Sequence, residues 1–502
     1  MRLCQIKLPA YLQALLLFGI FFAFMSSVQF ATPDMPDNDG YYHIKLAAIM
    51  RAQGLKPDFP WLPLSILNPS EYYDHHFLFH VALVPFTFGD LRLGAKWAAV
   101  TFSSLAFLAV WWLLRGQRIR YSALWALGLL AVSEAFLYRM SVTRAQSLSL
   151  GILALGLHWM FTGRHRHLAA LAFLYVWTYD AFPLLTVLGV IYTLALFLIE
   201  RRINLRPLLY ILLGTALGLA LNLYFPQNLV FIYHHLLPKL TDATSTRVGN
   251  EWFPYDTVQL LENSPLALAA FVAGALALGL GGRKMTVATA TAFLAAALFG
   301  LMLFQARRFV EYFPPFGLIF AALAWSPLLE PGEAVPAGLP VSRFSVKLNR
   351  FAPLVLAVIL LPGLYLTHQD AQASIRRAKP YNLYAGASAW LEKNTQPGER
   401  IFQTDWDDFP RLFFYNSGNT YLIGLDPTYM QLYDAALYGQ WVSISQGRVE
   451  NPSRVILKDY GARYIISDLN HSAFERSAEK DPRMNEVYRD EQSVIYRIED
   501  EK

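Results

Sequence analysis

The chain has 502 residues, of which 55% are hydrophobic, 15% aromatic and only 16% charged, and its formal net charge is +5. A soluble protein carries about 25% charged residues, so this composition excludes an ordinary soluble domain and predicts a polytopic membrane protein. The positive charge does not indicate nucleic-acid binding, because the basic residues fall in short clusters between apolar runs, as in cytoplasmic loops. The single cysteine, Cys4, excludes an intramolecular disulfide.

Eleven apolar runs are predicted to cross the membrane. The first, 11–30, is long enough to span a bilayer and has no convincing cleavage site after it, so we expect a retained span and not a signal peptide. The short fifth run and the sixth are predicted to form a hairpin whose polar tip carries Asp180. The ten later runs are 97–114, 121–137, 147–161, 168–177, 184–199, 207–224, 265–280, 285–304, 314–329 and 351–367.

The basic clusters predict the orientation of these spans. They follow spans two, four, six, eight and ten, so these loops and the N-terminus are expected on the cytoplasmic side. An odd number of spans then places the first loop, 31–96, and everything after residue 369 on the outer side. Arg139, Arg144, Arg307 and Arg308 also lie in outer loops, where basic residues are disfavoured and need a reason.

Two domains are expected. Residues 1–368 form a transmembrane catalytic domain, and 369–502 form a soluble extracytoplasmic domain of ordinary polarity. In the latter, a helical run at 382–393 and short apolar strands at 400–404, 463–467 and 493–497 predict a small α/β layer. The first outer loop is expected to contain a helix at 42–53, ended by Gly54, and a half-apolar stretch at 77–88 that lies at the membrane interface.

An acidic D-x-D, Asp37-Asn38-Asp39, opens the first outer loop directly after the first span. Two carboxylates two residues apart suit Mg²⁺ or Mn²⁺ that neutralises a phosphate leaving group. If no metal is used, one of them is a candidate general base for an acceptor hydroxyl. The alternative is that the acidic residues merely solvate the end of a helix.

Further candidate groups are predicted on the same outer side. His75 and His76 follow Asp74, and we expect His75 to be a metal ligand and His76 to contact the acceptor, unless the three form a hydrogen-bonded loop cluster. Glu134 lies within the predicted third span, where an ionisable group is a functional candidate or the structural partner of Arg139, about one helical turn away.

The four outer arginines are predicted to bind a phosphate, because guanidinium groups match phosphate oxygens and stay charged. The alternative is that they anchor lipid headgroups. Trp406, with Asp407 and Asp408, follows a predicted strand and is expected to form an acceptor platform, or a turn that caps the strand. No P-loop and no strand–GxGxxG–helix unit is present, and an outer-face enzyme would need a lipid-linked donor in any case.

Taken together, these features resemble the GT-C glycosyltransferases, and most of all the catalytic subunit of bacterial and archaeal oligosaccharyltransferase. The segment from Asp37 to Lys45 is similar to that family's acidic pair with two aromatics, a histidine and a basic residue. The segments 139–144, 177–183 and 406–408 resemble its second outer loop, its short aromatic hairpin and its Trp-Trp-Asp signature. The resemblance covers the general plan of all 502 residues.

The resemblance implies a bacterial or archaeal plasma-membrane enzyme that moves a sugar or oligosaccharide from a polyprenyl-phosphate or polyprenyl-diphosphate donor to an outer-face glycan or protein acceptor. The sequence departs from the family in three places. Arg-Ala-Gln stands where the second loop has an acidic pair, 405–408 reads Asp-Trp-Asp-Asp, and the loop before Glu311 is short. A flippase for lipid-linked saccharides and a non-catalytic accessory protein are the alternatives, although no repeated halves of the transporter kind are present.

Overall fold

The computed structural model describes residues 9–236, 249–281, 285–329 and 341–499. Contacts within the chain group it into two compact units. The first unit comprises Met1–Pro36, Lys96–Ala220 and Asn250–Arg377, and the second comprises Asp37–Ala95, Leu221–Gly249 and Ala378–Lys502. Most of the predicted first outer loop, Asp37–Ala95, therefore belongs with the C-terminal region. The predicted boundary at residue 368 separates a membrane domain from an aqueous domain. It is a different division from that into two compact units, and it stays a prediction.

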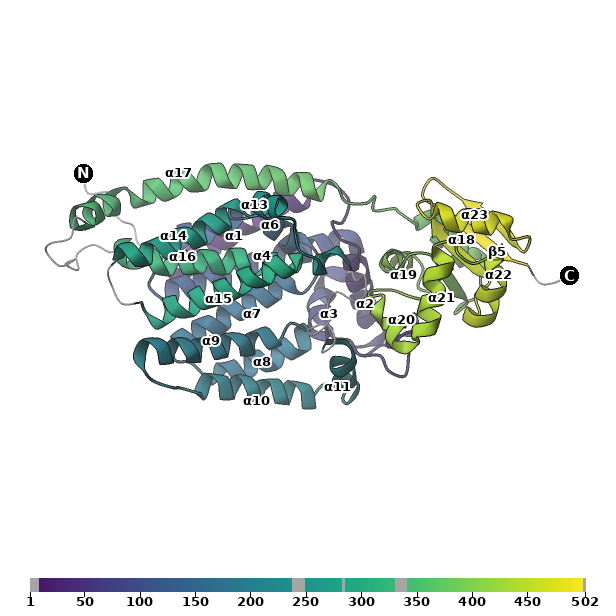
Figure 1. Cartoon of the computed structure of the whole chain (residues 1–502), viewed down its shortest axis with the longest axis horizontal. Coiled ribbons are helices and arrows are strands. Elements are labelled where there is room, and N and C mark those ends of the chain that lie inside the picture. The colour runs from purple at the N-terminus through teal and green to yellow at the C-terminus, as the bar shows by residue number, and fades with distance from the viewer. Residues whose placement is uncertain (1–8, 237–248, 282–284, 330–340, 500–502) are drawn as a thin grey trace. The chain divides into compact units, whose positions relative to one another are not determined.

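The first unit is helical (Figure 1). Each of the eleven predicted spans falls on one or two of its helices. These are α1 (Ala10–Gln29), α4 (Leu91–Gly116), α5 (Ser122–Leu127), α6 (Glu134–Ser141), α7 (Gln146–Phe161), α8 (His167–Thr178), α9 (Pro183–Glu200), α10 (Arg206–Ala220), α13 (Thr257–Asn263), α14 (Pro265–Gly281), α15 (Val287–Gln305), α16 (Phe313–Leu329) and α17 (Val341–Ile375).

Fewer of these helices have the length of a full span. Among the described residues, α1, α4, α9, α15 and the 353–375 part of α17 are long and apolar enough to cross a membrane, which makes five. Two bent pairs raise the number to seven if each pair is one span. The predicted count of eleven therefore stays a prediction, while the position of each apolar helix agrees with the sequence.

The third predicted span is not a continuous helix, which corrects the expectation for 121–137. The chain bends by 81° before Glu134, and a second bend, of 82°, separates α13 from α14. The two bends are bonded to each other, because Ser133 Oγ donates to Asn263 O over 2.8 Å and Ala267 N donates to Val132 O over 3.1 Å. Backbone groups freed by a break in hydrocarbon need such partners. Glu134 is thus the first residue of α6.

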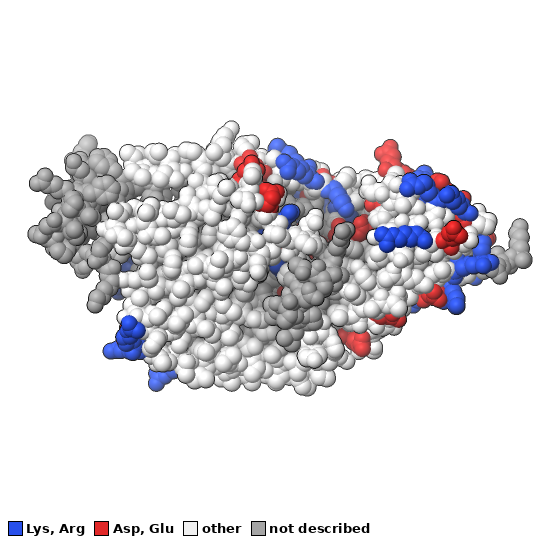
Figure 2. Space-filling model, in the orientation of Figure 1, with Lys and Arg blue, Asp and Glu red and all other residues white. Residues whose placement is uncertain are grey.

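The surface of the first unit is that of a membrane protein. On the face shown in Figure 2, the helices α14 to α17 and α7 to α10 present almost only uncharged atoms. Leu354, Val358 and Leu361 of α17 are about 60% exposed, at 61%, 60% and 65%. Large apolar side chains on an outward helix face are stable in lipid and costly in water, so α17 is suited to a lipid environment.

The second unit combines short helices with one sheet. The sequence-predicted helix is α2 (Asp39–Gln53), which ends at Gly54 with φ 104° as expected, and 77–88 forms α3 (Phe77–Leu83) followed by the 3₁₀ helix η1 (Val84–Thr87). The remaining helices are α11 (Gln227–Phe231), α18 (Ala385–Asn394), α19 (Phe409–Tyr415), α20 (Thr428–Tyr433), α21 (Ala435–Ser445), α22 (Pro452–Val455) and α23 (Ser472–Lys480).

The sheet has five strands in the order β2-β1-β3-β5-β4. The three predicted strands are confirmed as β1 (Arg400–Gln403), β3 (Tyr464–Asp468) and β5 (Ser493–Ile498). Strand β1 runs parallel to β2 (Thr420–Tyr421) and β3, whereas β5 is antiparallel to β3 and β4 (Met484–Arg489). The sequence missed β2, which has two residues, and β4, in which only one of six side chains is buried and the apolar residues do not alternate.

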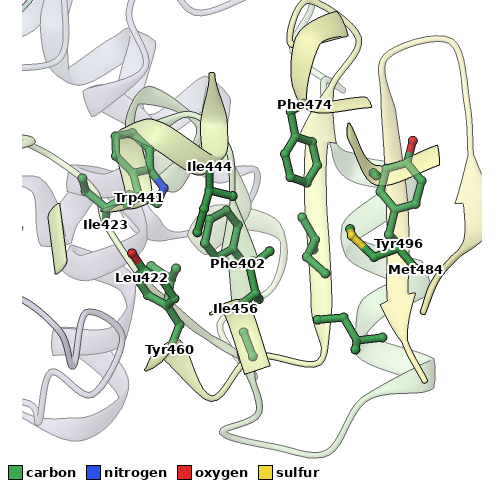
Figure 3. Packing of buried hydrophobic residues seen from close by; sticks show 14 of the residues in the cluster. Phe402, Leu422, Ile423, Trp441, Ile444, Ile456, Tyr460, Phe474, Met484 and Tyr496 are labelled. Atoms are coloured by element: carbon green, nitrogen blue, oxygen red, sulfur yellow. The ribbon is translucent and has the colours of Figure 1, made fainter. Parts of the chain in front are cut away.

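The core of the second unit lies between this sheet and its helices (Figure 3). Phe402 of β1 and Ile465 of β3 are completely buried, and Trp441 of α21 and Phe474 of α23 pack into the same cluster. The Trp441 indole nitrogen donates to Gln403 O over 2.9 Å, so burial of this large side chain leaves no polar group unpaired. This rigid layer carries residues 405–411, which follow β1 directly.

Candidate active site

Three of the four predicted arginines meet around two glutamates in the first unit. Arg139 lies on α6, Arg144 follows α6, and Arg308 and Glu311 lie on the 3₁₀ helix η5 (Arg307–Glu311). Glu251, on the short η4 (Asn250–Trp252), is 2.9 Å from Arg139 Nη1, 3.3 Å from Arg144 Nη1 and 3.9 Å from Arg308 Nη1. We call these five residues the arginine cluster.

The arginine cluster contains three guanidinium groups and two carboxylates, and the charge of Asp180 also acts on Arg308. Burial would raise the pKa of Glu251, but Arg139, Arg308 and Arg144 outweigh it and hold that pKa below its usual value. Glu251 is therefore ionised at neutral pH. Glu311 is completely buried and accepts two hydrogen bonds from Arg139 through Oε1, whereas its Oε2 has no hydrogen-bond partner among the described residues. Arg139, proposed as the partner of Glu134, is thus paired with Glu311 and Glu251.

Aromatic groups orient Arg308. Its Nη2 donates to the Tyr179 hydroxyl over 2.9 Å, and its guanidinium lies 4.2 Å from the ring centre of Trp252. Tyr179 comes from the turn between α8 and α9, the predicted polar tip. Arg307 points elsewhere, since its Nε donates to Pro254 O over 3.2 Å and its guanidinium stacks on Tyr255. A largely buried group of three arginines is suited to a phosphate, because guanidinium donors match phosphate oxygens.

The residues that precede the acidic pair in the sequence are hydrogen-bonded within the first unit. Lys96 is completely buried, and its Nζ donates to Thr32 O over 2.5 Å and Asp34 O over 2.8 Å. The Tyr138 hydroxyl donates to Pro36 O over 2.7 Å. The backbone is therefore held up to the residue that precedes Asp37.

In the second unit, Asp37 and Asp39 are half-buried, and Asp39 is the first residue of α2. Between them, the Asn38 side chain accepts a hydrogen bond from Arg411 Nε over 2.7 Å and donates to Asp407 Oδ2 over 2.6 Å. No sequence pattern indicates these contacts, because more than 360 residues separate the partners.

A buried chain of three groups lies beside α2. Asp74 Oδ2 is 2.8 Å from His80 Nδ1, and His80 Nε2 is 2.7 Å from His43 Nδ1. The partner of Asp74 is thus His80, and not the adjacent His75 or His76 considered from the sequence. His76 donates its backbone N–H to Asp74 Oδ1 over 3.0 Å. The acceptor role of His76 stays a prediction.

The metal ligands predicted from the sequence are not gathered into one site. Within the described ranges, no group of three or more His, Cys, Asp and Glu side chains is placed to hold a metal ion, and this includes Asp37, Asp39 and His75. His75 stacks on Phe231, with ring centres 5.0 Å apart. Any ion held by Asp37 and Asp39 would need further ligands from water or substrate, which is the usual way in which Mg²⁺ is bound.

The predicted acceptor platform is a short 3₁₀ helix, Trp406–Asp408, capped by Asp405. Trp406 packs against the core of the sheet, and Asp408 is 4% exposed and accepts from the Tyr384 hydroxyl over 2.8 Å. Burial, with a contribution from Asp405, raises the pKa of Asp407 to about 6, against the opposing effect of Lys379. The turn alternative describes this segment, and binding of an acceptor by these three residues stays a prediction.

The apolar helices are those of a polytopic membrane protein, and the chain also has a cluster of arginine–glutamate ion pairs and a C-terminal five-stranded sheet. No protein-family model matches the sequence, and no curated protein matches it significantly. Solved structures do match. The oligosaccharyltransferase AglB from Archaeoglobus fulgidus, in complex with an inhibitory peptide and a dolichol-phosphate, has a TM-score of 0.65 and 15% identity over 93% of this chain and 71% of its own.

Two other glycosyltransferases are similar. ArnT from Cupriavidus metallidurans, bound to undecaprenyl phosphate, has a TM-score of 0.60 and 15% identity over 97% of this chain and 98% of its own. The arabinofuranosyltransferase AftD from Mycobacteria has a TM-score of 0.58 and 16% identity over 96% of this chain and 40% of its own. These neighbours are GT-C membrane glycosyltransferases, and this chain has the GT-C fold.

Proposed function

We propose that the protein is a membrane glycosyltransferase that takes a sugar from a polyprenyl-phosphate or polyprenyl-diphosphate carrier and transfers it to an acceptor hydroxyl on the outer face of the membrane. The arginine cluster binds the lipid phosphate, with Arg307 at its edge, and the carboxylates of Asp37 and Asp39 act on the acceptor. The fold supports this function, because the neighbours include proteins in complex with dolichol-phosphate and undecaprenyl phosphate.

The observation that carries the proposal is the hydrogen bond from Tyr138 to Pro36 O. Tyr138 precedes Arg139 of the arginine cluster, and Pro36 precedes Asp37. Pro36 is the last residue of this part of the first unit, and Asp37 follows it in the chain. A phosphate-binding group and a carboxylate pair are the two parts that glycosyl transfer from a lipid carrier requires.

In the proposed reaction, Asp39 or Asp37 removes the proton of the acceptor hydroxyl, and the oxygen forms a bond to the anomeric carbon of the donor sugar. The bond between that carbon and the phosphate oxygen breaks, and its electron pair stays on the phosphate. Arg139, Arg144 and Arg308 stabilise the negative charge that develops there, because guanidinium groups act strongly in a water-poor site. The proton remains on the carboxylate until it is exchanged with water.

Mg²⁺ or Mn²⁺ fits this proposal only with ligands from the donor phosphate or water in addition to Asp37 and Asp39. Such an ion would supply charge neutralisation at the leaving phosphate. Trp406, Asp408 and His76 are proposed to contact the acceptor. Because the sequence departs from the oligosaccharyltransferase signature, the class of acceptor stays open between a glycan, a lipid and a protein.

The test is transfer by the purified protein from a set of radiolabelled polyprenyl-phosphate and polyprenyl-diphosphate sugars, with and without EDTA. We expect wild-type protein to release the carrier phosphate. The Asp39→Asn protein should release it at least ~100-fold more slowly, since a general acid–base group contributes about 10²–10⁴-fold to the rate. Loss of activity in EDTA with recovery in Mn²⁺ would assign a metal to the acidic pair. Full activity of Asp39→Asn protein, or movement of lipid across vesicles without bond cleavage, would refute the proposal.

A further inference from the structure

Asn38, the middle residue of the acidic segment, occupies the N-cap position of α2 but makes no capping hydrogen bond. Asparagine is among the residues that most often cap a helix with their side chain, by accepting from an N–H of the first turn. Here the side chain faces away from its own helix. The hydrogen bonds that replace the cap come from residues 407 and 411, on the segment that follows β1.

Every polar atom of the Asn38 carboxamide is used in these contacts. Its Oδ1 accepts from Arg411 Nε, and its Nδ2 donates to Asp407 Oδ2 over 2.6 Å and to Asp407 O over 3.2 Å. Arginine has only donors, and a carbonyl oxygen only accepts, so the chemistry of the partners fixes which end of the amide is which. The side chain therefore has one orientation.

Arg411 is itself rigid. It is 1% exposed, it donates from Nη1 to Pro380 O over 2.7 Å and from Nη2 to Lys379 O over 3.3 Å, and its guanidinium lies 4.4 Å from the centre of the Tyr41 ring. No ion pair of Arg411 is found among the residues that the structure describes. A buried guanidinium with neutral partners is costly, which indicates a role other than stabilising its own helix.

Asn38 shares its backbone with the two carboxylates that flank it. Successive residues are joined by planar peptide groups. Fixing the side chain of residue 38 therefore restricts the directions in which the side chains of residues 37 and 39 can point. Within the second unit, the acidic pair is thus held at its centre by residues 407 and 411 of the C-terminal region.

We propose that Asn38 is a positioning residue, and that Arg411 and Asp407 clamp its carboxamide so that Asp37 and Asp39 point in the direction that the chemistry requires. This inference rests on the proposed function, since it gives the C-terminal domain a direct part in shaping the acidic pair. It also assigns Asp407 a hydrogen-bonding role, in which an acceptor oxygen matters more than a negative charge.

The test compares kcat, the KM for the lipid donor and the thermal unfolding midpoint of the full-length protein in detergent. Asn38→Ser is the principal variant, because serine caps a helix but is too short to hold both Arg411 and Asp407. We expect kcat to fall about 10- to 100-fold, as is usual when a supporting residue is lost, with a smaller change in KM and no loss in the unfolding midpoint.

Two further variants test the clamp itself. Asp407→Ala should lower kcat as much as Asn38→Ser, and the double variant should be no worse than the more impaired single one, because both remove the same bond. Asp407→Asn keeps an oxygen that accepts from Asn38 Nδ2, so it should recover part of what Asp407→Ala loses. The matched control is Asn416→Ala, which removes a buried asparagine that bonds Asn419 and Gly418 in the same unit. It should leave kcat unchanged.

The outcomes separate the inference from the proposed function. Wild-type kcat in Asn38→Ser protein, an equal loss in Asn416→Ala protein, or an equal loss in Asp407→Asn and Asp407→Ala proteins would overturn the clamp while Asp39→Asn still abolishes transfer. If wild-type and Asp39→Asn proteins have the same rate, the proposed function fails, and the clamp is refuted with it.

Discussion

Arg139 and Glu311 form a buried ion pair in which both the Nε and the Nη2 of the arginine donate to one carboxylate oxygen. The side chain of Glu311 is 1% exposed and that of Arg139 is 13% exposed. Neither charge can be hydrated well at this depth, so each depends on the other. The pair joins α6 to η5 and fixes the centre of the arginine cluster.

Removing Glu311 should therefore destabilise the protein. We expect Glu311→Ala to cost about 1.5–3 kcal/mol of the free energy of unfolding, because Arg139 loses its charged hydrogen bonds to one of its two carboxylate partners and keeps Glu251. The measurement is the thermal unfolding midpoint in detergent. Glu262→Ala is the control, since Glu262 is exposed on α13, and it should change the midpoint little. A similar midpoint for both variants would contradict the structural role of the pair.

Arg308 should determine affinity for the donor. Lysine keeps the charge but cannot bond both the Tyr179 hydroxyl and a phosphate in the planar arrangement of a guanidinium. We expect Arg308→Lys to raise the KM for the lipid donor about tenfold, the equivalent of ~1.4 kcal/mol. Arg307→Lys should have a smaller effect, because Arg307 is engaged with Pro254 and Tyr255 outside the arginine cluster. The reverse order would remove Arg308 from the phosphate site.

Gly214 allows α8 and α10 to pack closely. A Cβ at residue 214 would lie 2.0 Å from the backbone oxygen of Ala169, so the helices must separate to admit it. Close approach through small residues is a main source of helix association in membranes. We expect Gly214→Ala to cost about 1–3 kcal/mol. Gly279→Ala in α14 meets no atom within 4 Å and should leave the unfolding midpoint unchanged or slightly higher.

The pair of His471 and Asp468 should make stability depend on pH. Its hydrogen bond raises the pKa of His471, while burial, which would raise the pKa of Asp468, is outweighed by bonds to His471 and Asn470 that lower it. The histidine contribution is complete below its unfolded pKa of about 6.5 and is lost as pH rises through the folded value. The aspartate contribution is complete above about 3.9 and is lost as pH falls through its folded value.

His471→Gln should accordingly lower the unfolding midpoint between about pH 4 and 6.5 and have little effect at pH 9, where the wild-type histidine is neutral. Unfolding curves of both proteins at pH 5 and pH 9 measure this. A difference between the two proteins that is the same at both pH values would show that charge is not involved.

Local patterns predicted a large part of the fold. The apolar runs located the long apolar helices, and β-branched and aromatic residues located β1, β3 and β5, because hydropathy and periodicity act over a few neighbouring residues. The same patterns did not reveal the bend before Glu134. That bend depends on Ser133 and its bonds to residues 263 and 264, which lie far along the chain.

The residues of the candidate site were likewise only partly predictable from the sequence. The sequence indicated Asp37, Asp39 and the arginines, because charged residues next to apolar runs are conspicuous and costly. It did not indicate Glu251 or Arg411. Glu251 stands in a polar segment without periodicity, and Arg411 appears as an ordinary basic residue until its burial is known.

By itself, the sequence determined that this is a membrane protein with a small C-terminal α/β layer and an acidic pair after its first apolar helix, since these follow from composition and short-range pattern. The tertiary structure decided which charges meet: Arg139 with Glu311, and Asn38 with Arg411 and Asp407. Pairing of residues hundreds of positions apart depends on how helices and strands pack, and no local property of the chain specifies it.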